Sequence, residues 1–590
     1  MTQIRRSQFI ITYGPGSILE GPHGPRIIPS LEFSGLFRSH RPTDFEITDR
    51  RLSSALLNGA GIVRLPSNAE LGRPEAAEVY WTKPFPQWSL CTRHNILYSQ
   101  KTCPACLQEG KEGSWDKANR EAVRFVRACP AGHLDDVDWV YITHFHSPNK
   151  TCHPKWLRWK SKGGALRHIE IECPKCGASV NLGWAYGHNW PCSARFPEKE
   201  SDYHPYRPGG CDKEARIIQR GASNLRIPEI VSALTIPESD TRLHRYLEMT
   251  PVFVMLRFAR FSSKAEFLEG LHQLQQDGKI QESIVNEIER YEEETILKAI
   301  SDVLSDLPKD AFRLRNQELA ALKHAAANGR TIPPTSPGYP PQFEVIKKNV
   351  RHLQMKTDRV LRVTPVNRLR VVLVQKGYRR VPAGSINDST LVDVSFQAEG
   401  RTWYPGTELF GEGIFIDIPD DDLEVQGPQA ERWLKAWHNP ENYHPQMLFG
   451  FDRHQFHPLF VWWHTFAHRL INALAVDSGY SSAAIRERVY IDVDQRTGKA
   501  RGGVLLYTAQ PGGDGTLGGL IALVPEFERV LQRAFYNLDA CSNDPLCGEE
   551  VFGPGRYNGA ACYACALISE TSCEHRNMSL DRNLLLENML

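Results

Sequence analysis

Residues 541–577 read CSNDPLCGEEVFGPGRYNGAACYACALISETSCEHRN, and their five cysteines indicate a metal-stapled domain. Two residues separate Cys562 from Cys565, a spacing that lets both thiolates of a tight turn bind one tetrahedral metal ion. Cys573 follows eight residues later, and either Cys541 or Cys547 can supply a fourth ligand. This combination is typical of a zinc site. Buried cysteines without a metal are the alternative, and a disulfide framework is disfavoured because nothing else in the chain indicates secretion.

The composition is that of a globular protein with several domains. The chain has 590 residues, of which 41% are hydrophobic and 24% charged, and its formal net charge is +1. The net charge of the whole chain therefore does not indicate a charged partner. Only local clusters of charged residues can indicate one. No apolar run approaches the ~20 residues that span a bilayer, and the first residues lack the apolar core of a signal peptide. We expect a cytoplasmic protein without a membrane partner, in which cysteines act as metal ligands.

The cysteines divide the chain into regions. Nine of the fourteen lie between positions 91 and 211, five lie between 541 and 573, and none lies in the 329 residues between. We expect an α+β multidomain fold with metal-stapled regions on either side of a helical and mixed centre. The four predicted regions are a zinc-stapled, zinc-ribbon-like part at 1–213, a mostly helical part at 214–345, a basic mixed α/β part at 346–450 and a C-terminal domain at 451–590.

The first N-terminal zinc candidate joins two short motifs. Cys91 and His94 form one pair with two-residue spacing, and Cys103 and Cys106 form the other. Such spacing suits a zinc ribbon or knuckle. The assignment of His94 is less firm than that of the three cysteines. Cys129 and His133 of the CPAGH motif either compete for its place or belong elsewhere.

The second N-terminal candidate is centred on a CPKC motif and leaves its ligand set open. Any four of five cysteines can close it, namely Cys152, Cys173, Cys176, Cys192 and Cys211. Tryptophans at 139, 156, 159, 184 and 190 lie among them, and they either stack on bases or pack over a small zinc module. The histidines nearby, including His144, are interpreted as surface or packing residues. With the C-terminal site, we expect two or three structural zinc ions.

Periodicity predicts the elements of the remaining chain. The alternating run at 5–13 predicts an N-terminal strand before a Gly-Pro-Gly turn, and residues 240–306 have helical spacing. Five prolines at 328–342 predict a loop, either a plain linker or a segment that gates a binding channel. Residues 402–418 resemble two strands with a glycine-rich connection.

A basic stretch at 347–380 is the candidate nucleic-acid contact. It holds eleven Lys and Arg residues against one acidic residue, Asp358, a density typical of proteins that bind a phosphate backbone. The alternative is a basic face that pairs with acidic residues of the chain, such as Glu424 and residues 420–422. The candidate DNA contacts are Lys347, Lys348, Arg351, Arg359, Arg362, Arg368, Arg370, Lys376, Arg379 and Arg380.

Several enzyme classes are excluded by missing motifs. His464 and His468 lie four residues apart on a predicted helix, but Thr465 replaces the glutamate of the HExxH protease motif. The two histidines are either packed in the core or line a site. The glycine-rich loop at 512–519 lacks the Lys and Ser/Thr of a P-loop, and no GxSxG nucleophile motif occurs. We therefore expect neither an ATP-driven motor nor an α/β-hydrolase.

Several long motifs resemble the DrmB family of the DISARM anti-phage defence system. They include RRSQFIITYGPGSILE, ACPAGHLDDVDW, QRGASN, HTFAH, YTAQPGGDGTLGGL, CSNDPLC and NGAACYACALISETSCEHRN. The resemblance implies a helicase-associated C-terminal domain in which four cysteines bind a metal. Cys562, Cys565 and Cys573 match that pattern, and the remaining ligand is Cys541 or Cys547.

The resemblance also implies a function and a partner. Members of the family work beside DrmA, a helicase that carries the ATPase motifs missing here. We therefore expect a non-enzymatic, DNA-engaging accessory subunit of a helicase in the restriction of phage. Two alternatives remain. One is a metal-dependent nuclease or other hydrolase with His464, His468, Glu487 and Asp514 around its site. The other is a scaffold that does not contact DNA.

Overall fold

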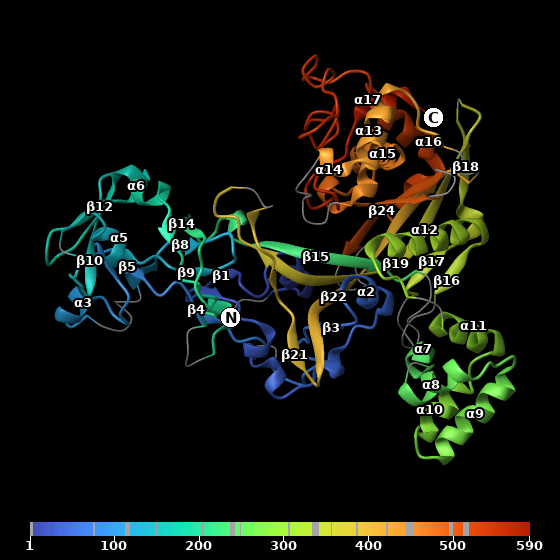
Figure 1. Cartoon of the computed structure of the whole chain (residues 1–590), viewed down its shortest axis with the longest axis horizontal. Coiled ribbons are helices and arrows are strands. Elements are labelled where there is room, and N and C mark those ends of the chain that lie inside the picture. Colours follow the sequence, from blue (N-terminus) through green and yellow to red (C-terminus); the bar gives the residue numbers. More distant parts are fainter. Residues whose placement is uncertain are drawn as a thin grey trace. The chain divides into compact units, whose positions relative to one another are not determined.

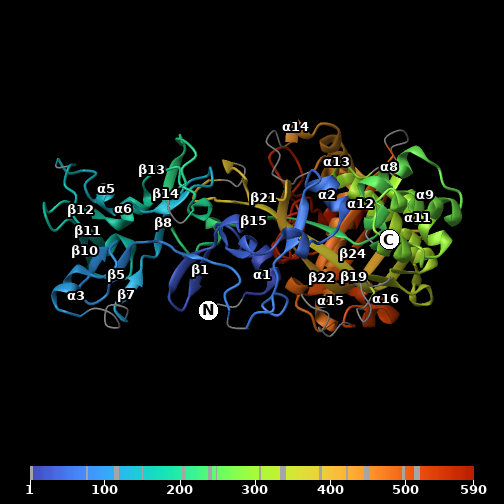
Figure 2. The same cartoon turned by 90° about the horizontal axis from the view of Figure 1, so that it is seen from below.

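A computed structural model shows how the chain folds (Figures 1 and 2). The structure describes residues 4–74, 77–111, 118–148, 150–201, 206–236, 242–247, 249–304, 307–332, 341–355, 357–384, 388–419, 423–443, 452–494, 499–510 and 518–589. Most of the proline-rich loop, Lys356, residues 420–422 and the glycine-rich loop with Asp514 lie outside these ranges.

The chain forms two compact units, each assembled from separate segments. Unit 1 comprises Met1–Ile47, Gly61–Val231 and Val374–Thr407, and unit 2 comprises Thr48–Ala60, Ser232–Leu373 and Glu408–Leu590. The boundaries after 231, 373 and 407 fall inside β15 (Ile227–Leu234), β19 (Val360–Arg379) and β22 (Arg401–Asp417). The domain limits predicted at 213, 345 and 450 stay predictions.

Unit 1 consists of short strands and very short helices. Its separate sheets have the strand orders β1-β2-β4, β12-β11-β10-β6-β5-β7 and β13-β14-β8-β9. Their strands are β1 (Ile18–Gly21), β2 (Gly24–Ile27), β4 (Lys83–Pro84), β5 (Ser89–Cys91), β6 (Ile96–Tyr98), β7 (Arg120–Ala122), β8 (Phe125–Ala128), β9 (Leu134–Asp136), β10 (Trp156–Ser161), β11 (Ile169–Glu172), β12 (Ser179–Asn181), β13 (Trp190–Pro191) and β14 (Glu214–Gln219). Helices include α1 (Arg6–Ile11), α3 (Pro104–Gln108), α5 (Trp139–Thr143) and α6 (Leu182–Gly187).

Tryptophans supply much of the apolar mass of unit 1. Trp139 and Trp190 are fully buried among Leu157, Ile171 and neighbouring residues, and the rings of Trp139 and Trp159 meet edge to face. Sheets of strands this short have a small core, so buried aromatic side chains contribute a large share of it. The packing interpretation of these tryptophans agrees with their burial, whereas Trp184 is 39% exposed.

Unit 2 is built on long antiparallel strands covered by helices. Its sheet has the order β16-β17-β19-β22-β24-β23, in which β23 (Arg486–Val493) and β24 (Ala500–Gln510) form an antiparallel pair. The long helix α15 (Pro458–Asp477) packs on both strands and on α16 (Phe527–Phe535), as Figures 1 and 2 show. Further elements are α2 (Arg50–Leu56), α12 (Ala311–Asn328), β16 (Arg330–Ile332), β17 (Phe343–Val345), β18 (Arg351–Gln354), α13 (Pro428–His438), α14 (Pro440–Tyr443) and α17 (Arg582–Glu587).

Five helices of unit 2 form a bundle with a core of its own (Figure 1). They are α7 (Arg242–Leu247), α8 (Thr250–Phe258), α9 (Lys264–Gln276), α10 (Glu282–Ile288) and α11 (Glu293–Leu304). Their buried residues include Leu243, Phe267, Leu271 and Ile296. The helices predicted over 240–306 are thereby confirmed, as is the α+β class of the chain.

Two predictions about strands are wrong. Residues 6–11 form helix α1 instead of a strand, and Gln8 closes its N-terminus by accepting from the backbone N–H of Arg5. Residues 401–417 form one 17-residue strand instead of two. The glycines that suggested a turn serve close strand packing, because a Cβ on Gly411 would lie 1.7 Å from the carbonyl oxygen of Thr508. In the part of the chain that the structure describes, no helix is both long and apolar enough to cross a membrane.

Candidate metal centres and the basic stretch

The first N-terminal tetrad gathers as predicted. Cys91 ends β5, Cys106 lies in α3, and their Sγ atoms are 3.9 Å apart. His94 directs Nδ1 at the thiols of Cys91, Cys103 and Cys106, at 3.4–3.8 Å. Its Nε2 lies 2.9 Å from the carboxylate of Glu109, the kind of outer partner that orients a metal-binding imidazole.

The five cysteines of the second candidate divide between two tetrads. Cys152 and Cys173 have their Sγ atoms 3.7 Å apart, and Cys176 Sγ is 3.3 Å from Nε2 of His144. The other ring nitrogen of this histidine is 2.7 Å from the carbonyl oxygen of Val140. His144, interpreted from the sequence as a packing residue, therefore completes a set of four.

Cys192 and Cys211 belong to a third tetrad, which the CPAGH motif completes. Cys129 Sγ lies 4.0 Å from Cys211 Sγ, and Nδ1 of His133 lies 3.3 Å from Cys129 Sγ and 3.5 Å from Cys192 Sγ. A local pattern indicated this pair, since CPAGH places a cysteine and a histidine four residues apart. No local pattern indicated their partners, because 82 residues separate Cys129 from Cys211.

The fourth tetrad contains both Cys541 and Cys547. The Sγ–Sγ distances are 3.5 Å from Cys541 to Cys562 and 3.7 Å from Cys547 to Cys565, and 3.8 Å separates the two knuckle thiols. The structure corrects the predicted set in one respect. Cys573 lies apart from this tetrad, beside His464, His468 and Glu487.

These four tetrads fit structural zinc. Two thiolates at ~2.3 Å from a tetrahedral ion lie roughly 3.8 Å apart, close to the distances found here, and all the cysteines are free of disulfides. Without a cation, the thiols of one tetrad do not all ionise. Although burial opposes it, hydrogen bonds from the backbone and from neighbouring cysteines lower the pKa of Cys562 to about 7, whereas the pKa values of other thiols are raised. Burial and the neighbouring Cys91 raise the pKa of Cys106 to about 12, and burial raises the pKa of Cys565 to about 11. A dication reverses this by stabilising the thiolates. The sequence predicts two or three sites, and the described residues hold four Cys/His tetrads.

Four of the predicted DNA contacts are buried, which corrects their assignment. Arg362 and Arg370 are bonded to the carboxylates of Asp417 and Glu408, and Arg379 donates to the carbonyl of Ser389. The fully buried Arg380 donates to the carbonyls of residues 16, 132 and 225. These guanidinium groups are satisfied inside the protein, so they do not present charge to a phosphate backbone.

The rest of the basic stretch differs in exposure. Lys347, Lys348 and Arg351 are exposed, whereas Arg359, Arg368 and Lys376 are half-buried. The guanidinium of Arg368 lies 5.9 Å from the centroid of the Phe410 ring.

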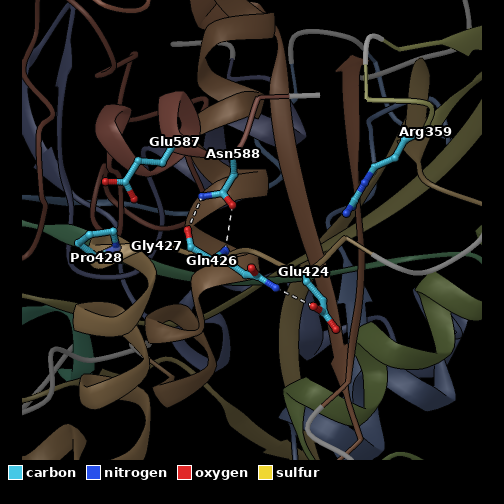
Figure 3. A pocket seen from close by; sticks show the side chains of 7 residues that line it. All are labelled: Arg359, Glu424, Gln426, Gly427, Pro428, Glu587 and Asn588. Atoms are coloured by element: carbon cyan, nitrogen blue, oxygen red, sulfur yellow. Dashed lines mark hydrogen bonds between the residues drawn. The ribbon is translucent and has the colours of Figure 1, made fainter.

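Arg359 lines a surface pocket that contains carboxylates. Figure 3 shows it with Glu424, Gln426, Glu587 and Asn588. Gln426 exchanges two backbone-to-side-chain hydrogen bonds with Asn588, each 2.9 Å long, and donates to Glu424 over 2.8 Å. Two acidic side chains in the lining make this pocket a poor place for a phosphate. The predicted DNA contact at Arg359 therefore has less support than those at the exposed residues.

Comparisons with known proteins match one family in the N-terminal region and a zinc-binding domain in the C-terminal region. A family described as "Domain of unknown function (DUF8724)" matches residues 5–227, and the "MrfA Zn-binding domain" matches residues 466–566, a range that contains the whole fourth tetrad. The chain is 26% identical over 545 residues to "DISARM protein DrmB" of Bacillus paralicheniformis, which covers 85% of this chain and 88% of that protein. The resemblance to DrmB is thereby confirmed. Zinc is the cofactor that the matched domain and the tetrads share.

One solved structure is also similar. It is described as "Crystal Structure of DUF1998 helicase MrfA bound to DNA", and the match covers 37% of this chain and 21% of that one, at 12% identity. Its TM-score is 0.19, so the match carries no structural argument.

Proposed function

We propose that the chain is a zinc-stapled, non-motor subunit of a DISARM-type helicase complex that acts against phage. The similarity to DrmB over 85% of the chain carries this proposal. The match of residues 466–566 to a zinc-binding domain supports it independently. The sequence contains no P-loop, so a separate DrmA-like helicase would supply ATP hydrolysis. The reducing cytoplasm is the compartment we propose, because fourteen free thiols suit it.

Purification from the native cell tests the partner. We expect the tagged chain to bring down a large helicase, identified by mass spectrometry, whose ATPase activity rises on addition of DNA. Recovery of the chain alone, with cleavage of DNA in the presence of a divalent metal, would instead support a hydrolase. The burial of His464, His468 and Glu487 does not favour that alternative.

We propose that DNA is engaged through the exposed Lys347, Lys348 and Arg351. The first two lie in a 3-10 turn, and the third begins β18. The carrying observation is that these three side chains are exposed, whereas Arg362, Arg370 and Arg379 of the neighbouring strand β19 are bonded inside the protein. Contacts of this kind are independent of base sequence and weaken with salt.

Charge reversal at these three positions tests the contact. If each side chain contacts one phosphate, the triple change to Glu should make the dependence of DNA binding on salt less steep. The magnitude of the slope of log K for binding against log salt concentration should fall by about 2–3 in the assembled complex. A matched control reverses three exposed cations elsewhere in unit 2, Arg257, Arg260 and Lys309. If the triple Glu variant has the same slope as the wild type, these residues do not contact DNA, and the alternative of a scaffold without DNA contact would stand.

A further inference from the structure

A fifth group of metal-binding side chains lies in the core of unit 2. His464 and His468 occupy successive turns of α15, and Glu487 is the second residue of β23. Cys573 lies in the segment beyond the fourth tetrad. Both histidines and the glutamate are 0% exposed, and Cys573 is 6% exposed. One ligand atom from each of the four lies within 4.8 Å of the others.

The backbone fixes which ring nitrogens carry protons. Nδ1 of His464 is 3.1 Å from the carbonyl oxygen of Ser579, and Nδ1 of His468 is 2.6 Å from that of Ala566. Carbonyl oxygens only accept hydrogen bonds, so both Nδ1 atoms are donors. In neutral imidazoles each Nε2 is then left with a lone pair.

The two lone pairs converge on a carboxylate. Nε2 of His464 lies 2.8 Å from Oε1 of Glu487, and Nε2 of His468 lies 3.2 Å from the same oxygen. An ionised carboxylate is also an acceptor, so these three atoms have no hydrogen to share. Oε2 of Glu487 is buried and has no hydrogen-bond partner among the residues that the structure describes. A buried carboxylate without hydrogen-bond donors destabilises the folded state unless a cation neutralises it.

The cysteine completes the set. Cys573 Sγ lies 3.3 Å from Nε2 of His464. The sulfur accepts from the backbone N–H groups of His575 and Asn577 at 3.3 and 3.2 Å. Burial and the nearby Glu487 raise the pKa of the metal-free Cys573 thiol, and these two hydrogen bonds oppose that rise. Hydrogen bonds of this kind stabilise a thiolate, which is the form that binds a metal.

We propose that His464, His468, Glu487 and Cys573 bind a fifth zinc ion, separate from the four Cys/His tetrads. Imidazole, carboxylate and thiolate are all zinc ligands, and an imidazole whose other N–H meets a carbonyl is the usual metal-bound arrangement. Four buried protein ligands make a closed, structural site that leaves no position for a substrate. The ion joins α15, β23 and the segment after the knuckle. The competing arrangement is a metal-free carboxylate between two protonated imidazoles.

Zinc content of the purified full chain tests the site. Atomic emission of the wild type should give five zinc ions per chain, and Glu487→Gln and Cys573→Ser should each give one fewer. The matched control is His575→Gln, which removes a half-buried ring 5.2 Å from that of His464 but leaves the backbone N–H on Cys573. It should keep the wild-type count. Equal zinc in wild type and both ligand variants would overturn the proposal.

Anomalous scattering decides the matter if the variants do not fold. Crystals of the wild-type chain, measured at the zinc edge, should show a peak about 2.0–2.3 Å from Nε2 of His468 and Sγ of Cys573. Peaks at the four tetrads without one here would overturn the fifth site while leaving the proposed function intact.

Discussion

Arg362 and Asp417 form a buried bidentate pair, with donor–acceptor distances of 2.8 and 2.6 Å. The arginine is 7% exposed and the aspartate 0%. Breaking such a pair strands a charge in the core, whereas replacing both partners by apolar residues is often tolerated. The role of Arg362 is therefore the stability of unit 2.

Arg362→Ala should lower the free energy of unfolding by about 3–5 kcal/mol. The double change Arg362→Met with Asp417→Leu should regain most of that loss, because it removes the buried carboxylate that the single change leaves with Lys323, 3.9 Å away, as its remaining cationic partner. Calorimetric melting of the three proteins measures both effects. A single variant as stable as the wild type would mean that the pair contributes nothing.

Asp136 makes the stability of unit 1 depend on pH. Burial raises the pKa of its carboxyl to about 6, a rise to which Asp135 adds and which the backbone N–H groups of Trp88 and Gln87 oppose. A raised pKa in the folded state means that folding takes up a proton between about pH 4 and 6. Stability from this group is therefore present at low pH and lost as the pH rises toward 6.

Asp136→Asn should flatten the stability profile of unit 1 between about pH 4 and 6, where the wild type loses up to ~3 kcal/mol. Thermal melting at several pH values measures this. A slope in the variant equal to that of the wild type would assign the dependence to other groups.

At the scale of elements, β22 depends on glycines at its contact with β24. Gly411 and Gly413 pair with Ala509 and Tyr507. A Cβ on Gly413 would lie 2.7 Å from the carbonyl oxygen of Leu506. The two backbones therefore approach more closely there than a side chain permits. The same absence of side chains made the segment look like a turn in the sequence.

Gly411→Ala should destabilise unit 2 by more than about 3 kcal/mol, because the clash is with backbone that cannot move without losing ladder bonds. The control is Gly187→Ala, where no atom of the described residues lies within 4 Å of the added carbon and the change should be within about 0.5 kcal/mol. Denaturant melts measure both. Similar values for the two would show that the strands separate easily.

Local patterns predicted some elements and sites but not others. Helical spacing predicted the bundle at 242–304, and CxxC spacing predicted the knuckle at Cys562 and Cys565. The role of His144 depends on a contact with Cys176, 32 residues away, which no local pattern records. The burial of Arg362 likewise depends on Asp417, 55 residues away. Residue type therefore predicted a ligand or a charge, while its partner depended on the fold.

At the scale of the whole molecule, the two units depend differently on zinc. Three tetrads lie among the short strands of unit 1, whereas unit 2 has one Cys tetrad beside a large apolar core. Structural zinc contributes roughly 10–16 kcal/mol of apparent binding free energy in small zinc peptides. Unit 1 has little apolar core to replace that contribution.

Chelation should therefore unfold parts of unit 1 first. With a chelator and a thiol reductant, we expect amide hydrogen exchange to rise across residues 89–217 while strands β23 and β24 stay protected. Mass spectrometry of peptides after exchange measures it, and readdition of zinc should restore protection. Uniform protection after metal removal would mean that packing alone holds unit 1.

The nesting of the N-terminal tetrads sets an order of assembly during synthesis. A ribosome delivers the chain from the N-terminus, so the ligands from Cys91 to Cys106 are complete long before Cys211 emerges. The set from His144 to Cys176 lies wholly inside the loop that Cys129 and Cys211 close. We therefore expect metal to bind the inner site before the outer one during synthesis. Until Cys192 and Cys211 emerge, Cys129 and His133 form only half a site and are exposed to oxidation or to binding of another ion.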